Sequence, residues 1–375
     1  MRIAVIAPIE ETVPPQRYGG IEWIAYYVAH GLGEKGHKVD LYASSNSKKE
    51  EYYTIMPIVE QSLRADTYFA QNLDLRETAK LLSISKTIEL LSKKDYDIIH
   101  NHAGYRFLAF ANLQKNKKIV TTHHMPLSIA FQNLVFTKYK DLPYISISNN
   151  QRKDSPHLNF VATVYNGIDL KHYPVVKDET KHKYPNMFFL ARMSPEKGAI
   201  EAASVALRLK KKLIVAAKVD ETDKPYFENF KPLIDNKLVM FVGEVEYDRK
   251  LEYLQTARCL LMPIKWEEPF GLMFTEAMAC GTPVIAFARG AAPEIIVDGK
   301  TGFLVNESEE LSRGNFLIKK TGIEGLCEAV KKIYSVPEDQ YMEMRKNARA
   351  YVVKNFTVER MVDEYEKVYE KILNR

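Results

Sequence analysis

The segment Trp266–Pro283 reads WEEPFGLMFTEAMACGTP and separates two short apolar runs. The run before it, Cys259–Ile264, and the run after it, Val284–Ala288, each have the length and composition of a buried strand. Between them, Leu272–Ala279 has the composition of a helix, and the glycine and proline that follow would end it. A strand, a helix and a second strand in this order predict a parallel α/β unit.

Two glutamates occupy different parts of this unit. Glu268 falls in the loop and Glu276 on the helix, eight positions later. In open α/β sheets such a loop lies at the carboxyl end of a strand, where ligands bind. The helix would begin at Gly271, and its first turn would offer unpaired amides and the positive end of the helix dipole. The segment therefore predicts a site for an anionic ligand.

The two glutamates stand in a dense motif, with Pro-Phe-Gly-Leu after the first and Glu-Ala-Met-Ala at the second. This motif resembles the signature of the family 4 glycosyltransferases, and further matches extend from Pro14 to about Val305. The resemblance implies an α/β fold of the GT-B type, in which two doubly wound, Rossmann-like parallel-sheet domains face each other across a cleft. A solvated loop and helix face is the alternative interpretation of the glutamates, but it leaves the rest of the motif unexplained.

The whole chain has the size and composition of a two-domain globular protein. It has 375 residues, of which 46% are hydrophobic and 27% charged. The net charge of +5 favours anionic ligands, and no basic run interleaved with aromatics supports a nucleic-acid partner. Three cysteines without metal-ligand spacing indicate free thiols in a reducing compartment. We see no signal peptide and no apolar run near the roughly 20 residues that span a bilayer. We therefore expect a cytoplasmic protein, with peripheral association at the inner face of the membrane left open.

The order of strand and helix patterns divides the chain into two parts. We expect the first domain at residues 1–175 and the second at residues 176–355. The polar segment 171–184 is the best candidate for a linker. The resemblance implies that the first domain lies on the acceptor side, that the second binds the nucleotide-sugar, and that the final helix, residues 356–375, crosses back to the first domain.

A pair of glycines precedes the first predicted helix, Ile21–Leu32. Gly19 and Gly20 would let the backbone approach a phosphate or a sugar closely. The pair alone favours a plain flexible loop, but the surrounding residues 18–22, Tyr-Gly-Gly-Ile-Glu, favour a binding role. The resemblance places this loop beside the diphosphate of the donor.

Two cations follow the strand that we predict at the start of the second domain. Arg192 and Lys197 are five positions apart, and between them Ser194 could cap a helix that begins at Pro195. The resemblance implies that both cations hold the donor diphosphate. Ala191 departs from the glycine that the family usually has before the arginine, which puts in doubt one backbone contact of this clamp.

Four histidines lie at the ends of two predicted strands: His100 and His102 at the first, His123 and His124 at the second. Four imidazoles could hold a metal, but no carboxylate partner lies near them in the sequence. The resemblance implies that one histidine after the later strand sits over the donor sugar. His124 aligns best with it, and His123 is the alternative one residue away. We expect the two earlier histidines to be hydrogen-bonded strand-end residues.

Together these features predict a retaining glycosyltransferase that moves a hexose from a nucleotide-sugar of the UDP-glucose or GDP-mannose type. The resemblance implies a front-face mechanism without metal, and we interpret Asp95-Tyr-Asp97 as a turn rather than a metal site. No cofactor is expected, because the nucleotide-sugar is a substrate. The acceptor is left open as a small molecule, a glycan or a lipid-linked glycan. The expected catalytic residues are His124 and Glu268, and the expected donor-binding residues are Gly19, Gly20, Arg192, Lys197, Phe270, Gly271, Leu272 and Glu276.

Three other activities fit parts of the pattern. A glycosidase could use the two glutamates as its carboxylate pair, although hydrolysis would not need the two cations. A nucleotide-sugar isomerase or a non-catalytic nucleotide-sugar-binding protein could also share the fold, because a fold does not determine a function.

Overall fold

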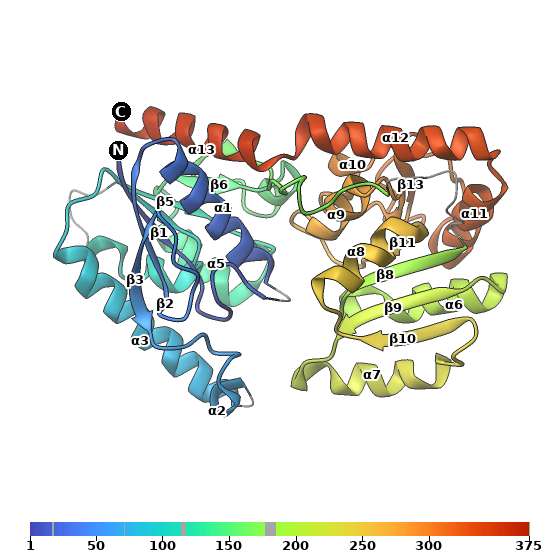
Figure 1. Cartoon of the computed structure of the whole chain (residues 1–375), viewed down its shortest axis with the longest axis horizontal. Helices are drawn as coiled ribbons and strands as arrows, with labels where there is room; N and C mark the ends of the chain where they lie inside the picture. Colours follow the sequence, from blue (N-terminus) through green and yellow to red (C-terminus); the bar gives the residue numbers. More distant parts are fainter. Residues whose placement is uncertain (17–18, 71, 114–117, 177–184, 375) are drawn as a thin grey trace. The chain divides into compact units, whose positions relative to one another are not determined.

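In the computed structural model the chain forms two compact units (Figure 1). Unit 1 comprises Met1–Gly167 and Val358–Arg375, and unit 2 comprises Ile168–Thr357. The structure describes residues 1–16, 19–70, 72–113, 118–176 and 185–374. Tyr18 of the glycine-pair motif and residues 177–184 of the expected linker lie outside the described residues.

Unit 1 is built on a parallel sheet, which has seven strands among the described residues, in the order β3-β2-β1-β4-β5-β6-β7. The order reverses between β1 and β4, which are neighbours. The carboxyl ends of these two strands therefore form the topological switch point, where open α/β sheets bind ligands. The strands are β1 (Arg2–Ile6), β2 (Lys38–Ser44), β3 (Thr54–Val59), β4 (Ile98–Asn101), β5 (Ile119–Thr122), β6 (Tyr144–Ser146) and β7 (Phe160–Thr163).

Helices cover the sheet of unit 1, and the last of them comes from the C-terminus of the chain. The α13 helix packs along α1, as Figure 1 shows, and Gly31 of α1 lacks a side chain where Val362 touches it. The helices are α1 (Gly20–Glu34), α2 (Thr67–Ala70), α3 (Leu73–Ser92), α4 (Tyr105–Leu108), α5 (Ala130–Lys138) and α13 (Val358–Leu373), with 3₁₀ turns at Ala111–Leu113 and Asn150–Asp154.

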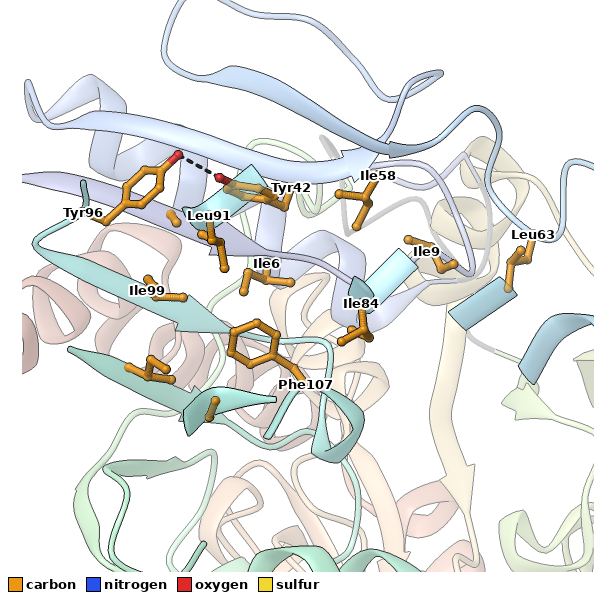
Figure 2. Close-up of a cluster of buried hydrophobic side chains, with 13 residues drawn as sticks. Ile6, Ile9, Tyr42, Ile58, Leu63, Ile84, Leu91, Tyr96, Ile99 and Phe107 are labelled. Atoms are coloured by element: carbon orange, nitrogen blue, oxygen red, sulfur yellow. Dashed lines mark hydrogen bonds between the residues drawn. The ribbon is translucent and has the colours of Figure 1, made fainter. Parts of the chain in front are cut away.

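One hydrophobic core cluster of unit 1 joins α3 to the sheet (Figure 2). Side chains from β1, β4, α3 and α4 meet there, and the hydroxyl of Tyr42 lies 2.9 Å from that of Tyr96. Tyr96 in turn donates to Asp40 Oδ2 at 2.6 Å. The buried polar groups of this core are thus paired with each other, as buried polar groups must be.

β3 differs from the expectation from the sequence, because residues 44–68 have the polar composition of irregular loops and we expected no strand there. The strand contains Pro57, which cannot donate a ladder hydrogen bond. The position is tolerated because β3 is an edge strand of the sheet.

Unit 2 also contains a parallel sheet, with six strands among the described residues, in the order β10-β9-β8-β11-β12-β13. Its order reverses between β8 and β11. The strands are β8 (Asn186–Arg192), β9 (Leu213–Lys218), β10 (Val239–Gly243), β11 (Ala257–Met262), β12 (Val284–Phe287) and β13 (Gly302–Val305). The two parallel-sheet α/β units confirm the predicted fold class.

The resemblance also leads us to expect a turn at residues 298–303. Residues 299–301 form this turn, but Gly302 and Phe303 already belong to β13. Gly302 pairs with Val284 of β12, and a Cβ at this position would lie only 1.9 Å from the Val284 carbonyl oxygen. Gly302 therefore follows the turn directly and permits a close approach between two strands.

The helices of unit 2 include α9 (Leu272–Ala279), whose bounds are those that we predicted, and α12, which packs against it. Arg345 of α12 is buried and donates to the carbonyl of Cys280 at 3.3 Å. The other helices are α6 (Ala199–Leu209), α7 (Lys224–Phe230), α8 (Tyr247–Thr256), α10 (Ala292–Ile295), α11 (Gly322–Ser335) and α12 (Glu338–Asn355), with 3₁₀ turns at Pro195–Lys197, Glu221–Asp223 and Lys231–Leu233. Among the helices described in both units, none is long and apolar enough to cross a membrane.

Candidate active site

In unit 2 the expected site residues gather at the switch point of the sheet. Arg192 is the last residue of β8, and Lys197 ends the 3₁₀ turn that follows. Glu268 lies in the loop after β11, which is the neighbour of β8. Parallel strands end at the same edge of a sheet, so residues separated by about 75 positions are brought together by the topology alone.

Lys197 and Glu268 form a buried ion pair. Their Nζ and Oε2 atoms are 2.5 Å apart, and the two side chains are only 8% and 10% exposed. Trp266 completes the arrangement, because its Nε1 donates to the same carboxylate oxygen at 2.7 Å and its ring lies 4.4 Å from Nζ. An ion pair at this depth depends on such additional partners. The sequence predicted one residue for the diphosphate and the other for the sugar, and the structure joins them directly.

Two glycines bring the loops of this ion pair close to neighbouring backbone. Gly198 has a φ of 80°, and a Cβ there would lie 2.1 Å from the carbonyl oxygen of Pro263. Gly290 has a φ of 58°, and a Cβ there would lie 2.2 Å from the backbone of Glu268. The neighbouring Ala291 amide donates to the Glu268 carbonyl at 2.8 Å. Both glycines therefore combine a left-handed conformation with a contact that excludes a side chain.

Arg192 is more accessible than Lys197. Its side chain is 36% exposed and pairs with Glu196 at 2.7 Å and with Asp223 at 3.3 Å. The expected helix cap between the two cations is wrong in detail: Ser194 makes no capping hydrogen bond, and only a 3₁₀ turn follows it. Gly198, in the left-handed conformation, interrupts the backbone there, so α6 begins only after it.

The N-terminus of α9 follows the ion pair along the chain. Gly271 is its N-cap residue, with a φ of 91° and no side chain to satisfy the first amides. Phe270 is buried and packs against Phe356 with the ring centroids 5.7 Å apart, which anchors this end of the loop. Leu272 opens the helix. First-turn amides of a helix have no intrahelical acceptor and can bind an anion.

Glu276 lies one turn further along α9 and is held by two residues that the sequence did not indicate. The Tyr173 hydroxyl donates to its Oε1 at 2.7 Å, and Lys250 of α8 approaches the same oxygen at 3.1 Å. Lys250 also donates to the Tyr173 hydroxyl at 3.1 Å. No spacing rule links these three positions, which only the folded unit brings together.

Glu267, next to Glu268, belongs to a separate group of charges. It accepts from Arg289 and Arg313, each at 2.7 Å, and from the amide of Gly290 at 2.9 Å. Burial raises the pKa of this carboxyl, but the hydrogen bonds and the charge of Arg289 outweigh it and lower the pKa overall. Glu267 was not among the site residues expected from the sequence. Its contacts tie the loop after β11 to the loop after β12.

In unit 1, Gly19 lies buried immediately before α1. A Cβ at this position would lie 2.7 Å from Pro15, so the loop depends on glycine. Gly20 is the first residue of α1. Glu22, in the first turn, is buried, and burial raises its pKa to about 7. The loop follows β1 and thus ends at the switch point of the sheet of unit 1.

The four histidines at the neighbouring strands β4 and β5 differ in their surroundings. His124 is partly buried, and its Nε2 lies 2.9 Å from Nδ1 of His102. His123 is fully buried, packs edge-on against Phe136, and has no hydrogen-bond partner for either ring nitrogen among the described residues. His100 is hydrogen-bonded, as we expected. Among the described residues, no group of three histidine, cysteine, aspartate or glutamate side chains could hold a metal ion.

Comparison with known families accounts for most of the chain. A family model described as Glycosyltransferase Family 4 matches residues 18–172, and a model described as Glycosyl transferases group 1 matches residues 175–351. This chain is a family 4 glycosyltransferase of the GT-B fold. Its activity is therefore glycosyl transfer from a donor of the nucleotide-sugar type.

Individual proteins similar to this glycosyltransferase have diverse substrates. N-acetyl-alpha-D-glucosaminyl L-malate synthase from Bacillus anthracis is 25% identical over 321 residues, which cover 77% of this chain and 78% of that protein. Sucrose-phosphate synthase from Thermosynechococcus elongatus has a similar structure, with a TM-score of 0.80 at 18% identity, covering 100% of this chain and 99% of that one. HepE from Anabaena, in complex with UDP and glucose, has a TM-score of 0.73 at 16% identity and 99% coverage of both chains. The two structures show a shared fold.

Proposed function

We propose that this glycosyltransferase transfers a hexose from a UDP- or GDP-linked donor to an acceptor hydroxyl, with retention of configuration and without a metal ion. The observation that carries the proposal is the buried pair of Lys197 and Glu268 beside Arg192 at the switch point of unit 2. Such a site supplies fixed positive charge for a diphosphate and a fixed carboxylate for sugar hydroxyls.

The two cations are suited to the leaving group. When the glycosidic bond of the donor breaks, negative charge grows on the departing diphosphate, and preorganised cations stabilise that charge. Arg192 is accessible enough to exchange Glu196 for a phosphate oxygen. Lys197 is held by Glu268 and Trp266, so that it needs little reorganisation. In unit 2, the amides of Phe270, Gly271 and Leu272 would add diphosphate and sugar contacts. In unit 1, the loop at Gly19 and Gly20 stays our proposal for a donor-binding segment.

The carboxylates of Glu268 and Glu276 would bind different parts of the donor. Glu268 would bind sugar hydroxyls near the reacting face, because its second oxygen is not engaged by Lys197 or Trp266 in the described contacts. Glu276 would bind the ribose hydroxyls. Its carboxylate accepts from Tyr173 and Lys250 through one oxygen, and ribose hydroxyls would join or replace these partners.

His124 would contact the donor sugar. Its partial exposure supports this assignment, since His123 is enclosed by Phe136 and the core around it. We propose front-face attack, in which the donor phosphate itself accepts the proton of the acceptor hydroxyl. No protein base is then required, and the two cations take the place of a metal ion.

The sugar is assigned by analogy. HepE binds UDP and glucose, so UDP-glucose is our first candidate and GDP-mannose the second. A glycan, a lipid-linked glycan or a small molecule would be the acceptor. The three cysteines are buried and form no disulfide, which supports a cytoplasmic location, with or without peripheral membrane association.

The proposal is tested by thermal denaturation with nucleoside diphosphates and their sugars, because a ligand of the folded state raises the melting temperature. The nucleotide-sugar that stabilises most is then incubated with acceptors, and the anomeric configuration of the product is read by NMR. We expect retention, and unchanged activity in EDTA. An inverted product, or activity that EDTA abolishes and manganese or magnesium restores, would contradict the proposal.

A further inference from the structure

His124 is the outer end of a chain of hydrogen-bonded side chains inside unit 1. Its Nε2 lies 2.9 Å from Nδ1 of His102, whose Nε2 lies 3.1 Å from Nδ1 of His100. That same Nδ1 lies 2.5 Å from the hydroxyl of Tyr369, and Nε2 of His100 lies 2.8 Å from Oγ1 of Thr122. This row of side chains begins in the loop just after β5, passes the end of β4 and ends on the C-terminal helix α13.

The inner end of the chain fixes where its protons lie. Tyr369 is fully buried, and among the described contacts its hydroxyl has one hydrogen-bond partner, Nδ1 of His100. Burial raises the pKa of this phenol well above its usual value, so it keeps its proton and must donate it. Nδ1 of His100 is therefore an acceptor. A neutral imidazole has one donor and one acceptor, so Nε2 of His100 donates to Thr122.

The same rule then determines which nitrogen carries hydrogen in the other two rings, those of His102 and His124. Nε2 of His102 lies 3.1 Å from Nδ1 of His100, whose single lone pair already accepts from Tyr369. A second lone pair at this distance would be repelled, so we infer that Nε2 of His102 carries hydrogen and shares that acceptor as a second, weaker donor. Nδ1 of His102 is left as an acceptor, and His124 Nε2 must donate to it. Burial, followed by the charges of neighbouring histidines, lowers the pKa of all three rings well below the usual value. Each ring is thus neutral. The hydrogen bonds from His124 through His102 and His100 to Thr122 run in one direction, and Tyr369 donates a further hydrogen bond to His100.

We propose that His102, held in turn by His100 and Tyr369, is a positioning residue that fixes His124 as a neutral imidazole with hydrogen on Nε2 and a lone pair on Nδ1. In the described part of the chain, Nδ1 of His124 has no hydrogen-bond partner. It would accept a hydrogen bond from a hydroxyl of the donor sugar, and this last step rests on the proposed function.

The inner residues act through His124 and not on the substrate. His100 and His102 are 0% and 2% exposed, so neither ring can reach a ligand. Without His102, Nε2 of His124 would lose its acceptor and the ring could adopt either tautomer. The C-terminal helix thereby takes part in the site through the Tyr369 hydroxyl.

The tautomer is measured directly by NMR of the full chain with ¹⁵N-labelled histidine. We expect hydrogen on Nε2 of His124 in the wild type and in His102→Gln, because the glutamine oxygen can accept from Nε2 and its amide can donate to His100. We expect a mixture of tautomers in His102→Leu. Hydrogen on Nδ1 in the wild type would overturn the proposal, whether or not the enzyme turns over.

Kinetics test the consequence for the reaction. We expect His102→Leu to lower turnover about tenfold, the value of one net hydrogen bond, with little change in the donor Michaelis constant. His102→Gln should restore most of the loss. Tyr369→Phe should lower turnover more than the matched control Tyr144→Phe, which removes a buried hydroxyl bonded to the Tyr139 carbonyl.

Two outcomes would overturn the positioning role: equal turnover in the leucine and glutamine variants, or equal effects of the two tyrosine changes. A wild type that transfers no sugar from any nucleotide-sugar would instead refute the proposed function. The tautomer measurement would still decide in which direction the hydrogen bonds between the histidines run.

Discussion

The site of unit 2 and the histidine chain of unit 1 both lie at the carboxyl ends of central parallel strands, but they are built from opposite chemistry. In unit 2, Lys197 and Glu268 are buried as charges and stabilise each other. In unit 1, His100 and His102 are buried and His124 partly buried, and all three are held as neutral rings. The difference teaches that the same fold can prepare one site for growing charge and another for a directed, uncharged hydrogen bond.

The largest expected effect comes from removing one partner of the buried ion pair in unit 2. Lys197→Met should lower the free energy of unfolding by about 3–5 kcal/mol, because it leaves Glu268 as a buried charge without its partner. The double variant with Glu268→Gln should recover much of this stability, because no unpaired charge is left. Denaturant unfolding measures both. In contrast, His102→Leu should cost only about 1–3 kcal/mol, since it leaves neutral groups unpaired. Equal costs for the two single variants would contradict the distinction.

The second prediction concerns the neutral histidines of unit 1. His124→Ala should lower turnover roughly 10²-fold, as for the loss of one preorganised hydrogen-bonding group, while nucleotide affinity stays unchanged. His123→Ala should have the milder effect on turnover, because the ring is enclosed against Phe136. Steady-state kinetics and calorimetry with the free diphosphate separate the two quantities. If His123→Ala lowered turnover more than His124→Ala, the catalytic role would belong to His123.

Much of the architecture was predictable because local patterns determine it. The bounds of α9 and the strand order around Glu268 follow from a helical segment between two apolar runs. β3 escaped prediction because Pro57 is compatible with a strand only at the edge of a sheet, which no local pattern reveals.

The site was predictable only as a set of residues and not as a set of contacts. The motif named Lys197 and Glu268 but did not indicate that they touch, because that contact depends on β8 and β11 being neighbours. Tyr173 and Lys250, which hold Glu276, carry no motif at all. Long-range polar partners of this kind become visible only once the sheet order is known.

The third prediction concerns Glu276. Glu276→Ala should weaken binding of the nucleoside diphosphate about 10- to 100-fold, the range for a hydrogen bond to a charged group, with a smaller effect on the fold. The matched control is Glu201→Ala, which removes a carboxylate of the same unit that pairs with Lys265 at 2.5 Å. Calorimetry with the free diphosphate decides the matter, and unchanged affinity in the Glu276 variant would refute the ribose assignment.

The smallest expected effect of a single residue concerns the acid sensitivity of unit 1. Burial lowers the pKa of His123 to about 3 and those of His100, His102 and His124 well below 6.5. Below pH 6.5 the unfolded chain therefore binds more protons than the folded chain. Stability that is present above this pH is lost on acidification. Each histidine contributes a loss of about 1.4 kcal/mol at pH 5.5. Glu22, whose pKa is raised to about 7, has the opposite effect between about pH 4.5 and 7, because its folded form binds the additional proton. It accounts for one proton, whereas the four histidines account for four.

Urea unfolding at pH 7.5 and 5.5 measures this loss. His123→Leu should reduce the difference between the two pH values by about 1.4 kcal/mol, because one proton of uptake is removed. A pH difference that is the same in this variant and in the wild type would show that the ring is not buried in its neutral form.

The central claim is that the cations of unit 2 stabilise the charge that grows on the leaving diphosphate, and turnover at saturating donor tests it most directly. Removing the side chain of either Arg192 or Lys197 should lower turnover roughly 10²–10³-fold. Arg192→Lys should recover little, because a point charge cannot replace a planar fork, and the two losses should not add in the double variant. If only the Michaelis constant for the donor rises and turnover is unchanged, the pair merely binds the donor and the claim is wrong.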